Sequence, residues 1–201
     1  MSCVVAETPS LSAYLETCAD RMRAAATFDL DAAFNRAVEA ISAALIGGRP
    51  LLVCGNGGSM ADAQHIAGEL VARFLLNRKG LPVIALGSNP ATLTAWANDV
   101  DYPSLFAREV EAFGGAGGVL LGISTSGNSA NVLAAFARAR ALGMTTVALT
   151  GGAGGKMAEP GAVDVCLCPA APNTPSIQEI HTPIYHLLCQ LVEARCAAAL
   201  G

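Results

Sequence analysis

Two of the three histidines in the chain stand at spacings that would let them share a ligand with a carboxylate or an amide. His65 and Glu69 are four residues apart, so on a helix both side chains project from one face. Gln178 and His186 are eight apart, which again places them on one helical face. Such groups can hold a divalent metal ion or perform acid–base chemistry. A solvated His65–Glu69 pair and a His186 ring packed among apolar neighbours are the alternatives.

A glycine-rich turn, Gly55-Asn56-Gly57-Gly58-Ser59, joins an apolar run to a helical pattern. It is not a dinucleotide fingerprint, because Met60 stands where the third glycine would be, and it lacks the lysine of a P-loop. Its backbone N–H groups and the side chains of Asn56 and Ser59 can still approach a polar ligand closely. A strand-to-helix turn of purely structural use is the alternative.

A second polar loop, Ser124-Thr125-Ser126-Gly127-Asn128-Ser129, also precedes a helical pattern. Its four hydroxyls lie beside the free N–H groups and the positive dipole end of a helix, which favours a phosphate monoester without any Lys or Arg. Ser129 is a good N-cap residue, so a capped helix after a polar loop is the alternative. A serine nucleophile is disfavoured, because Ser126 replaces the glycine that a nucleophile elbow requires.

A third polar pair, Asn98-Asp99, follows the segment Ala91 to Ala97 and offers a carboxylate to sugar hydroxyls. The same pair is common in turns. The chain has two lysines, Lys79 and Lys156, and neither stands in an apolar run that would favour a Schiff base. Carboxylate and imidazole acid–base chemistry is therefore what the residues permit.

The elements that position these groups alternate between strands and helices. We expect strands at Leu51 to Cys54, Val83 to Leu86, Val119 to Ile123, Thr145 to Leu149 and Val163 to Cys168. Helical patterns cover Met60 to Leu76, Ala130 to Leu142 and Ser176 to Ala198, and Ser10 to Leu45 predicts two further helices that end at Gly47-Gly48.

This alternation predicts an α/β fold, a doubly wound, flavodoxin-like sheet of five parallel strands flanked by helices. We expect one domain over residues 1–201, with an N-terminal helical segment at 1–48 and an α/β core at 49–198. Ligands of such sheets bind beyond the C-terminal ends of the strands, which is where the polar loops stand.

Composition excludes two classes of partner. A net charge of −4 does not supply the positive field of a nucleic-acid binder. Hydrophobic residues reach 53%, but the longest uncharged run, Ala112 to Ala137, is interrupted by Ser, Thr, Asn and Gly and does not predict a membrane span. Seven cysteines without a paired spacing, and an N-terminal stretch without a basic region, predict a reducing, cytoplasmic location.

Taken together, these motifs resemble the phosphoheptose isomerases, a family of sugar-isomerase (SIS) domain proteins. The matching segments arrive in the family's order: the glycine turn, Ala61-Asp62-Ala63-Gln64-His65 with Glu69, Asn98-Asp99, the serine loop, and Gln178-Glu179-Ile180-His181 with His186. The resemblance implies conversion of sedoheptulose 7-phosphate to D-glycero-D-manno-heptose 7-phosphate through an enediol. It also implies a homotetramer with its active sites at subunit interfaces.

The resemblance implies a role for each matching residue. Phosphate contacts fall to Ser124, Thr125, Ser126 and Ser129, and sugar contacts to Asn56, Gly57, Gly58, Asn98 and Asp99, with Ser59, Glu69 and Gln178 also lining the substrate site. One zinc ion per subunit is implied on His65, Glu69, Gln178 and His186. We assign Glu69 as the base and His186 as the acid, and we leave His181 as a structural residue or a support for the site.

Two other kinds of SIS-domain protein are alternatives. A tetrameric interaction protein that associates with the bacterial replication initiator shares the glycine and serine loops, but as a family it lacks the equivalents of Glu69 and His186. A sugar-phosphate-sensing transcription regulator needs a DNA-binding module, and the acidic N-terminal segment is too short for one. Both alternatives therefore fit this sequence less well than the isomerase.

Overall fold

Five parallel strands form one sheet at the centre of the protein. The computed structural model describes residues 10–200. The strands are β1 (Leu51–Gly55), β2 (Val83–Ala85), β3 (Val119–Ile123), β4 (Thr145–Leu149) and β5 (Val165–Leu167). Their order is β2-β1-β3-β4-β5, and each neighbouring pair is parallel. The predicted doubly wound sheet is therefore confirmed.

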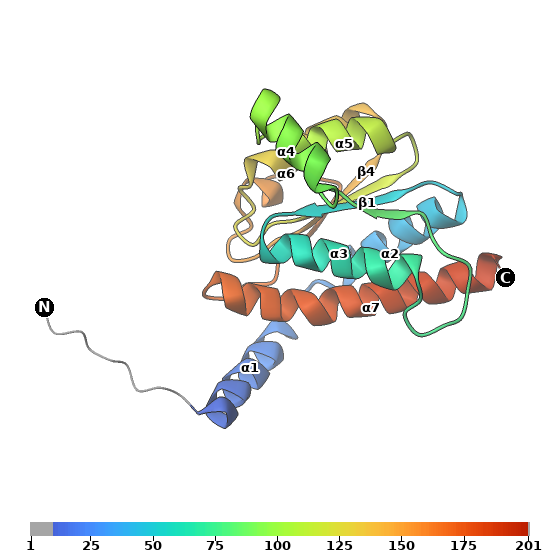
Figure 1. The fold of residues 1–201 in the computed structure, drawn as a ribbon. Coiled ribbons are helices and arrows are strands. Elements are labelled where there is room, and N and C mark those ends of the chain that lie inside the picture. Colours follow the sequence, from blue (N-terminus) through green and yellow to red (C-terminus); the bar gives the residue numbers. More distant parts are fainter. Residues whose placement is uncertain (1–9, 201) are drawn as a thin grey trace, which may run out of the picture.

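Helices cover both faces of the sheet (Figure 1). One face carries α2 (Asp31–Ile46), α3 (Gly58–Val71) and α7 (Thr174–Leu200). The other carries α4 (Pro90–Asp99), α5 (Leu105–Phe113) and α6 (Ala130–Ala141). A short 3-10 turn, η1 (Gly155–Ala158), follows β4. The sequence did not predict α5 at all.

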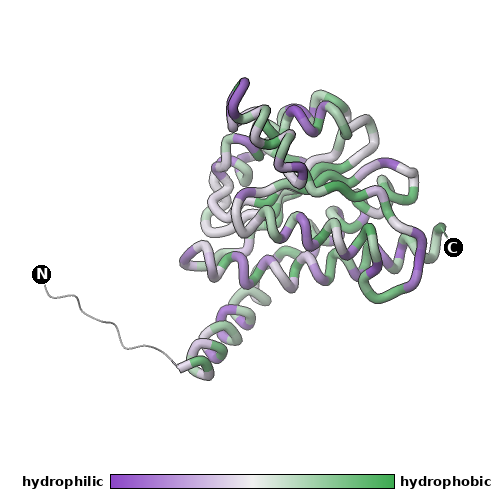
Figure 2. The backbone as a smooth tube through the Cα atoms, in the orientation of Figure 1, coloured by the Kyte–Doolittle hydropathy of each residue, from purple (hydrophilic) through white to green (hydrophobic). Residues whose placement is uncertain are grey.

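Apolar side chains along the strands alternate between two cores. Leu51 and Val53 of β1 pack beneath α2, α3 and α7, whereas Leu52 and Cys54 pack against α5 and α6. Every residue of β1 and β3 is buried. Strands covered on both faces need continuous apolar runs, which is why the hydropathy of the chain is highest through the sheet (Figure 2).

The strand order reverses between β1 and β3, and this places two polar loops together. The chain leaves β1 toward β2 on one side and later returns to β3 on the other side. Helices α3 and α6, which follow β1 and β3, therefore lie on opposite faces of the sheet and leave a crevice at its C-terminal edge. The glycine turn and the serine loop both open at this edge.

Some predicted boundaries are wrong. The helix predicted over Met60 to Leu76 ends at Val71, because the backbone N–H groups of residues 74–76 bind the Glu193 carboxylate instead of continuing the helix. The strand predicted over 163–168 is confined to 165–167. Asn98 and Asp99 are the last residues of α4 and do not form a separate loop.

The N-terminal segment forms the two predicted helices. Helix α2 ends at Gly47, and Gly48 adopts a φ of +70° that favours glycine, so the predicted C-terminal cap is confirmed. Helix α1 (Leu11–Ala25) contains no buried residue and stands away from the sheet (Figure 1). It contacts α7 through Glu179, which accepts a hydrogen bond from Tyr14 and lies 2.8 Å from Arg21 Nη1.

Within residues 10–200, no helix combines the length and the apolar composition that crossing a membrane requires.

Candidate active site

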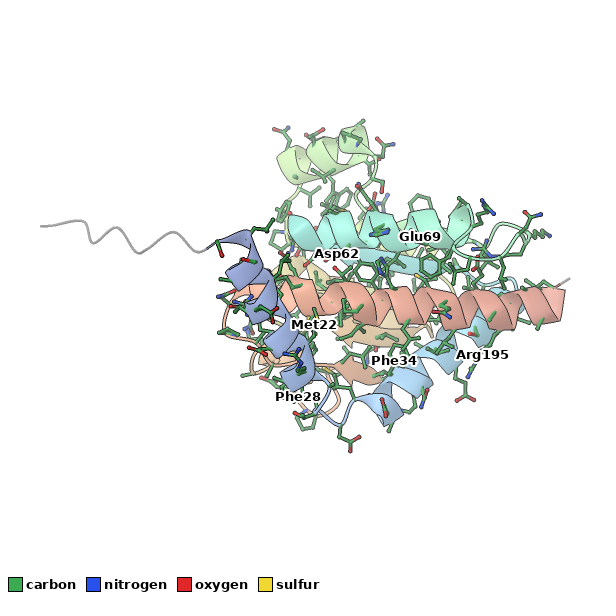
Figure 3. All side chains as sticks on the ribbon, turned by 90° about the horizontal axis from the view of Figure 1, so that it is seen from below. Met22, Phe28, Phe34, Asp62, Glu69 and Arg195 are labelled. Carbon is green, nitrogen blue, oxygen red and sulfur yellow. The ribbon has the colours of Figure 1, made fainter. Side chains whose placement is uncertain are left out.

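Helices α3 and α7 lie side by side and run in the same direction, so they carry the predicted residues in register (Figure 3). Near the start of both helices, Gln178 fills the space beside Gly58, and a Cβ atom on Gly58 would stand 2.3 Å from Gln178 Nε2. About two turns further on, His65 contacts Tyr185 and His186. Figure 3 labels Asp62 and Glu69 on α3, beside α7.

An imidazole and carboxylate cluster forms where His65, Glu69 and His186 meet. His65 Nε2 lies 2.9 Å from Glu69 Oε1, as the spacing of four residues predicts. The ring centroids of His65 and His186 are 5.2 Å apart in an edge-on arrangement, and Phe74 packs against the other side of His186. The side chains of His65 and Glu69 are 43% and 24% exposed, so the cluster is open to a ligand from one side.

Tyr185 supports His65 from the protein interior. Its side chain is buried, and its hydroxyl lies 3.1 Å from His65 Nδ1 and 3.4 Å from Asp62 Oδ1. Burial raises the pKa of Tyr185 above its ordinary value, so the hydroxyl keeps its hydrogen. Burial also raises the pKa of the Asp62 carboxyl.

Gln178 lies apart from the other three predicted metal ligands. The eight residues between Gln178 and His186 correspond to about 12 Å along the axis of α7. Within residues 10–200, no three His, Cys, Asp or Glu side chains are grouped closely enough to hold a metal ion. Two imidazoles and one carboxylate are nevertheless donors that zinc prefers, so His65, Glu69 and His186 fit the ion in chemistry. The four-residue zinc set stays a prediction.

The serine loop forms a concave turn at the N-terminus of α6. Ser124 is buried, and its Oγ lies 2.8 Å from Ser129 Oγ. Ser129 occupies the N-cap position without making a side-chain cap bond, so its hydroxyl is not used to close the helix. Ser126 is exposed, and its Oγ accepts a hydrogen bond from the Asn128 N–H. The hydroxyls are therefore placed around a helix N-terminus, as an anion site requires.

The serine loop rests on the backbone of the segment between β4 and η1. Gly127 has a φ of +63°, and a Cβ atom there would stand 1.8 Å from the Gly154 carbonyl oxygen. The Met157 N–H donates to the Gly127 carbonyl, and the Lys156 N–H donates to Asn128 Oδ1. Only glycine fits at Gly127, both for its φ and for this close approach. The loop's shape is therefore fixed from behind by main-chain contacts.

Asn56 ties the glycine turn to the serine-loop side of the crevice. It forms a reciprocal amide pair with Asn131, in which Nδ2 of each donates to Oδ1 of the other at 2.9 and 2.8 Å. The Tyr102 hydroxyl also donates to Asn56 Oδ1, at 2.8 Å. Asn131 is buried on the first turn of α6. These contacts join the loops after β1 and β3 into one site.

Comparison with known proteins identifies the family. Residues 13–151 match the family model of the SIS domain. The phosphoheptose isomerase of Crocosphaera subtropica is 54% identical over 154 residues, which are 77% of this chain and 78% of that protein. The phosphoheptose isomerase of Burkholderia pseudomallei is 48% identical over 177 residues, 87% of this chain and 89% of that protein. The chain belongs to the phosphoheptose isomerases.

The family assignment agrees with the fold. The solved structure of phosphoheptose isomerase GmhA from Neisseria gonorrhoeae matches with a TM-score of 0.84 and 37% identity, covering 92% of this chain and 97% of that chain. As a phosphoheptose isomerase, the protein is an aldose–ketose isomerase that acts on a sugar phosphate in heptose biosynthesis. The resemblance inferred from the sequence motifs is therefore confirmed.

Asn98 and Asp99 are the predicted sugar contacts of this phosphoheptose isomerase. Both are exposed at the C-terminal end of α4, where Asn98 Nδ2 donates to Asp99 Oδ1 at 2.8 Å. No hydrogen bond joins either side chain to the glycine turn or the serine loop within residues 10–200. Their role as sugar contacts stays a prediction. Ser59 is buried in the first turn of α3.

Sequence reasoning missed four residues that support the phosphoheptose isomerase site: Asp62, Tyr102, Asn131 and Tyr185. Asparagine is uncommon inside helices, so its position near the start of a predicted helix was a weak indication that Asn131 makes a specific contact. Tyr185 stands next to His186 in an apolar stretch, where no local pattern indicates a polar contact. The third histidine, His181, is fully buried, and its Nε2 lies 2.8 Å from the Thr150 carbonyl oxygen. Burial lowers the pKa of His181, which suits a structural role.

Proposed function

We propose that the enzyme converts sedoheptulose 7-phosphate to D-glycero-D-manno-heptose 7-phosphate. The observation that carries this proposal is a site with two chemically different ends. A hydroxyl-lined helix N-terminus suits the phosphate, and an open imidazole and carboxylate cluster suits the carbonyl end of the sugar. The glycine turn connects the two ends, because α3 begins at Gly58 and carries His65 and Glu69.

The phosphate binds in the serine loop in this proposal. Ser124, Thr125, Ser126 and Ser129 donate hydroxyl hydrogen bonds, and the N-terminal N–H groups of α6 add theirs. The packing of Gly127 on Gly154 supports this assignment, because it holds the loop in one shape before the ligand arrives. Binding of the phosphate orients the far end of the sugar toward α3 and α7.

Acid–base transfer takes place at the other end. Glu69 takes a proton from C1 of the ketose, and His186 protonates the oxygen on C2, which gives the enediol. His186 then takes the proton from the oxygen on C1, and Glu69 returns its proton to C2, so the product is the aldose and both groups are restored. The contact of His65 with both Glu69 and His186 supports these roles, because it orients the base and lies beside the acid.

A zinc ion is part of this proposal. His65, Glu69 and His186 would hold it together with Gln178, and the bound ion would polarise the oxygens of the substrate. An amide is an unusual zinc ligand, so we expect modest affinity and a replaceable ion. We also propose a homotetramer whose subunits complete one another's sites, which is supported by the distance between Gln178 and His186 within one chain and by the uncovered α1.

The Glu69→Gln variant tests the base assignment. We expect turnover of sedoheptulose 7-phosphate to fall by about 10³-fold, because the amide cannot take the proton, with substrate affinity retained. Isomerisation in D₂O, followed by NMR, reports whether C1 still exchanges its hydrogen. The control is Glu111→Gln, which alters an exposed carboxylate on α5 and should leave turnover unchanged. Full turnover or full exchange in Glu69→Gln would rule out the assignment.

A further inference from the structure

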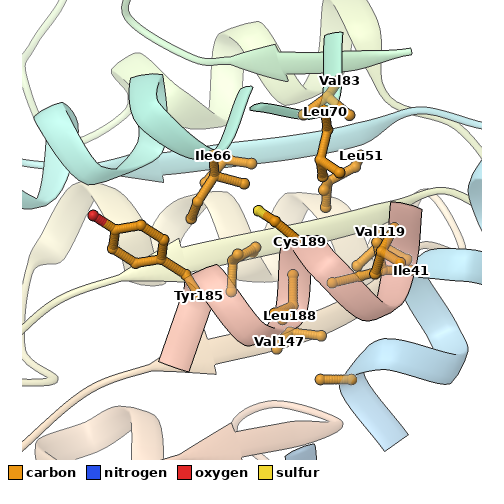
Figure 4. Packing of buried hydrophobic residues seen from close by; sticks show 14 of the residues in the cluster. Ile41, Leu51, Ile66, Leu70, Val83, Val119, Val147, Tyr185, Leu188 and Cys189 are labelled. Carbon is orange, nitrogen blue, oxygen red and sulfur yellow. The ribbon is translucent and has the colours of Figure 1, made fainter. Parts of the chain in front are cut away.

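The Tyr185 hydroxyl is the centre of a short chain of polar contacts behind His65. It lies 3.1 Å from His65 Nδ1, 3.4 Å from Asp62 Oδ1 and 3.5 Å from Thr182 Oγ1. Figure 4 shows the Tyr185 ring at the margin of the apolar cluster, with the hydroxyl turned away from the aliphatic side chains. A buried phenol hydroxyl normally has a defined partner, and here it has three candidates.

The contacts of His65 fix where its ring hydrogen lies. Nε2 faces Glu69 Oε1 at 2.9 Å, and a carboxylate oxygen only accepts, so Nε2 of the neutral ring carries the hydrogen. Nδ1 is then an acceptor, and the Tyr185 hydroxyl must be its donor. Asp62 Oδ1 receives no hydrogen from Tyr185 in this arrangement, because the phenol has a single hydrogen.

We propose that Tyr185 is a positioning residue that supports both tautomers of His65. With Nε2 toward Glu69, the hydroxyl donates to Nδ1. With Nε2 bound to a cation, Nε2 gives up its hydrogen and Nδ1 acquires one, so the Tyr185 oxygen accepts from Nδ1 and its hydrogen turns to Asp62. No hydrogen is gained or lost by the phenol, which only rotates its O–H bond. The second arrangement rests on the proposed zinc site.

Asp62 is suited to receive the rotated hydroxyl. It is half-buried on α3, one turn before His65, and no protein group within residues 10–200 donates to its buried Oδ2. A carboxylate is a stronger acceptor than the competing Thr182 hydroxyl, which lies slightly further from Tyr185. The groups that hydrogen-bond to a metal-binding imidazole commonly set its tautomer and its affinity for the metal. The chain of contacts from Asp62 through Tyr185 to His65 can therefore influence both properties of His65.

Tyr185→Phe separates the hydroxyl from the ring. The phenylalanine keeps the edge-on packing against His65, where the ring centroids are 5.4 Å apart, and removes only the oxygen. In the full-length protein without added metal, at alkaline pH, ¹⁵N NMR of the imidazole nitrogens reports the tautomer. The chain has three histidines, so comparison with a His65→Asn variant assigns the signals of His65.

The expected spectra differ between the two proteins. In the wild type, His65 should be a single tautomer with the hydrogen on Nε2, and in Tyr185→Phe its shifts should move toward the average of the two tautomers. Tyr14→Phe is the matched control, because it removes a phenol hydroxyl that contacts α7 away from His65. A wild-type ring with hydrogen on Nδ1, or unchanged His65 shifts in Tyr185→Phe, would overturn the proposal. Circular dichroism checks that each variant is folded.

Zinc binding tests the second arrangement. Competition with a chromogenic chelator should show an affinity about tenfold weaker in Tyr185→Phe. Asp62→Ala should weaken zinc similarly but leave the metal-free tautomer unchanged, since Asp62 is used only after the hydroxyl rotates. Unchanged zinc affinity in either variant, or absence of zinc binding by the wild type, overturns the proposed metal-bound arrangement of Tyr185 and Asp62. A wild type that binds zinc but does not isomerise the heptose phosphate contradicts the proposed function alone.

Discussion

Position 58 requires glycine because the amide of Gln178 occupies the space that a side chain would need. A Cβ atom would stand 2.3 Å from Gln178 Nε2, which forces the amide to move. We therefore expect Gly58→Ala to lower kcat/KM and zinc affinity about tenfold while the fold is retained. Steady-state kinetics and chelator competition measure both.

Gly68→Ala is the control for this substitution on the same helix. No atom lies within 4 Å of the added methyl group, so removing the flexibility of glycine should raise stability by about 0.5–1 kcal/mol and leave kinetics unchanged. Equal kinetics for the two variants would contradict the idea that Gly58 exists to seat Gln178.

Residue by residue, the sequence predicted the side chains that project from one helix better than those that meet across two. The spacing of four residues was enough to pair His65 with Glu69, and the structure shows that contact. Tyr185 and Asn131 became visible only when α7 lay beside α3 and α6 lay beside the glycine turn. Their partners are far away along the chain, and no local pattern encodes such a meeting.

The segment that follows α3 is held by one buried carboxylate of α7. Glu193 accepts hydrogen bonds from the N–H groups of Phe74, Leu75 and Leu76, and its Oε1 lies 3.2 Å from Arg78 Nε. Arg78 in turn donates to the Glu69 carbonyl oxygen. The end of the helix that carries Glu69 is therefore anchored by Glu193 through two sets of bonds.

Glu193→Gln should destabilise the protein by about 3 kcal/mol, because it leaves Arg78 buried without its counter-charge and weakens three N–H bonds. Urea unfolding at fixed protein concentration measures the change. Glu111→Gln removes a carboxylate from an exposed ion pair and should change stability by less than about 0.5 kcal/mol. Equal changes in the free energy of unfolding for the two substitutions would show that the buried Glu193 carboxylate stabilises the protein no more than an exposed one.

The contribution of Glu193 should depend on pH in one direction. Burial by itself raises the pKa of this carboxyl, but the three N–H donors and Arg78 bring it below its ordinary value. A lowered folded-state pKa gives stability that is complete above the ordinary glutamate pKa of about 4.3 and is lost as pH falls through the folded value. The difference between wild type and Glu193→Gln should be constant near neutrality and shrink below about pH 4. A difference that is unchanged at lower pH would contradict this.

Elements were predicted well where packing and local pattern agree. Continuous apolar runs identified all five strands: β1 and β3 are buried at every residue, and even the edge strand β2 exposes only Ile84. The pattern failed beyond Val71, where apolar residues continue at helical spacing but Glu193 binds their N–H groups. Helix α5 was also not predicted, although its nine residues bury one face, Leu105, Phe106, Glu109 and Val110.

Helix α1 exposes large apolar side chains although it is too short to be stable alone in water. None of its fifteen residues is buried, and Leu11 and Leu15 are 73% and 57% exposed. Short helices are marginal in water unless a face is covered. In the proposed homotetramer, other subunits cover this face.

Leu15→Glu should therefore reduce the mass of the assembly and lower activity, while circular dichroism loses at most the helical signal of α1. Size-exclusion chromatography with light scattering measures the mass. Asp20→Asn is the control, since Asp20 lies about 140° around the helix from Leu15 and is mostly exposed. A Leu15→Glu protein with the wild-type mass would show that this face is not an interface.

For the whole molecule, the alternation of strands and helices predicted a doubly wound parallel sheet, and the location of the site at the C-terminal edge follows from that fold. The sequence could not predict which residues of the proposed metal site come from the same chain. The sequence places Gln178 and His186 on one helical face, but the structure puts Gln178 beside the start of α3 and His186 beside its middle, about two turns further on. Assembly is a property of surfaces that no single chain's pattern encodes.

The packing of the serine loop on Gly154, in the segment after β4, makes one part of the site rigid. Other parts of the site can change more easily. Where Gly127 meets Gly154, main chain packs on main chain, and a new side chain has no room. Helix α4, by contrast, contains no buried residue, so its exposed side chains leave space for change. An engineer who wants this scaffold to accept a shorter or longer sugar should therefore keep the phosphate loop intact and vary α4.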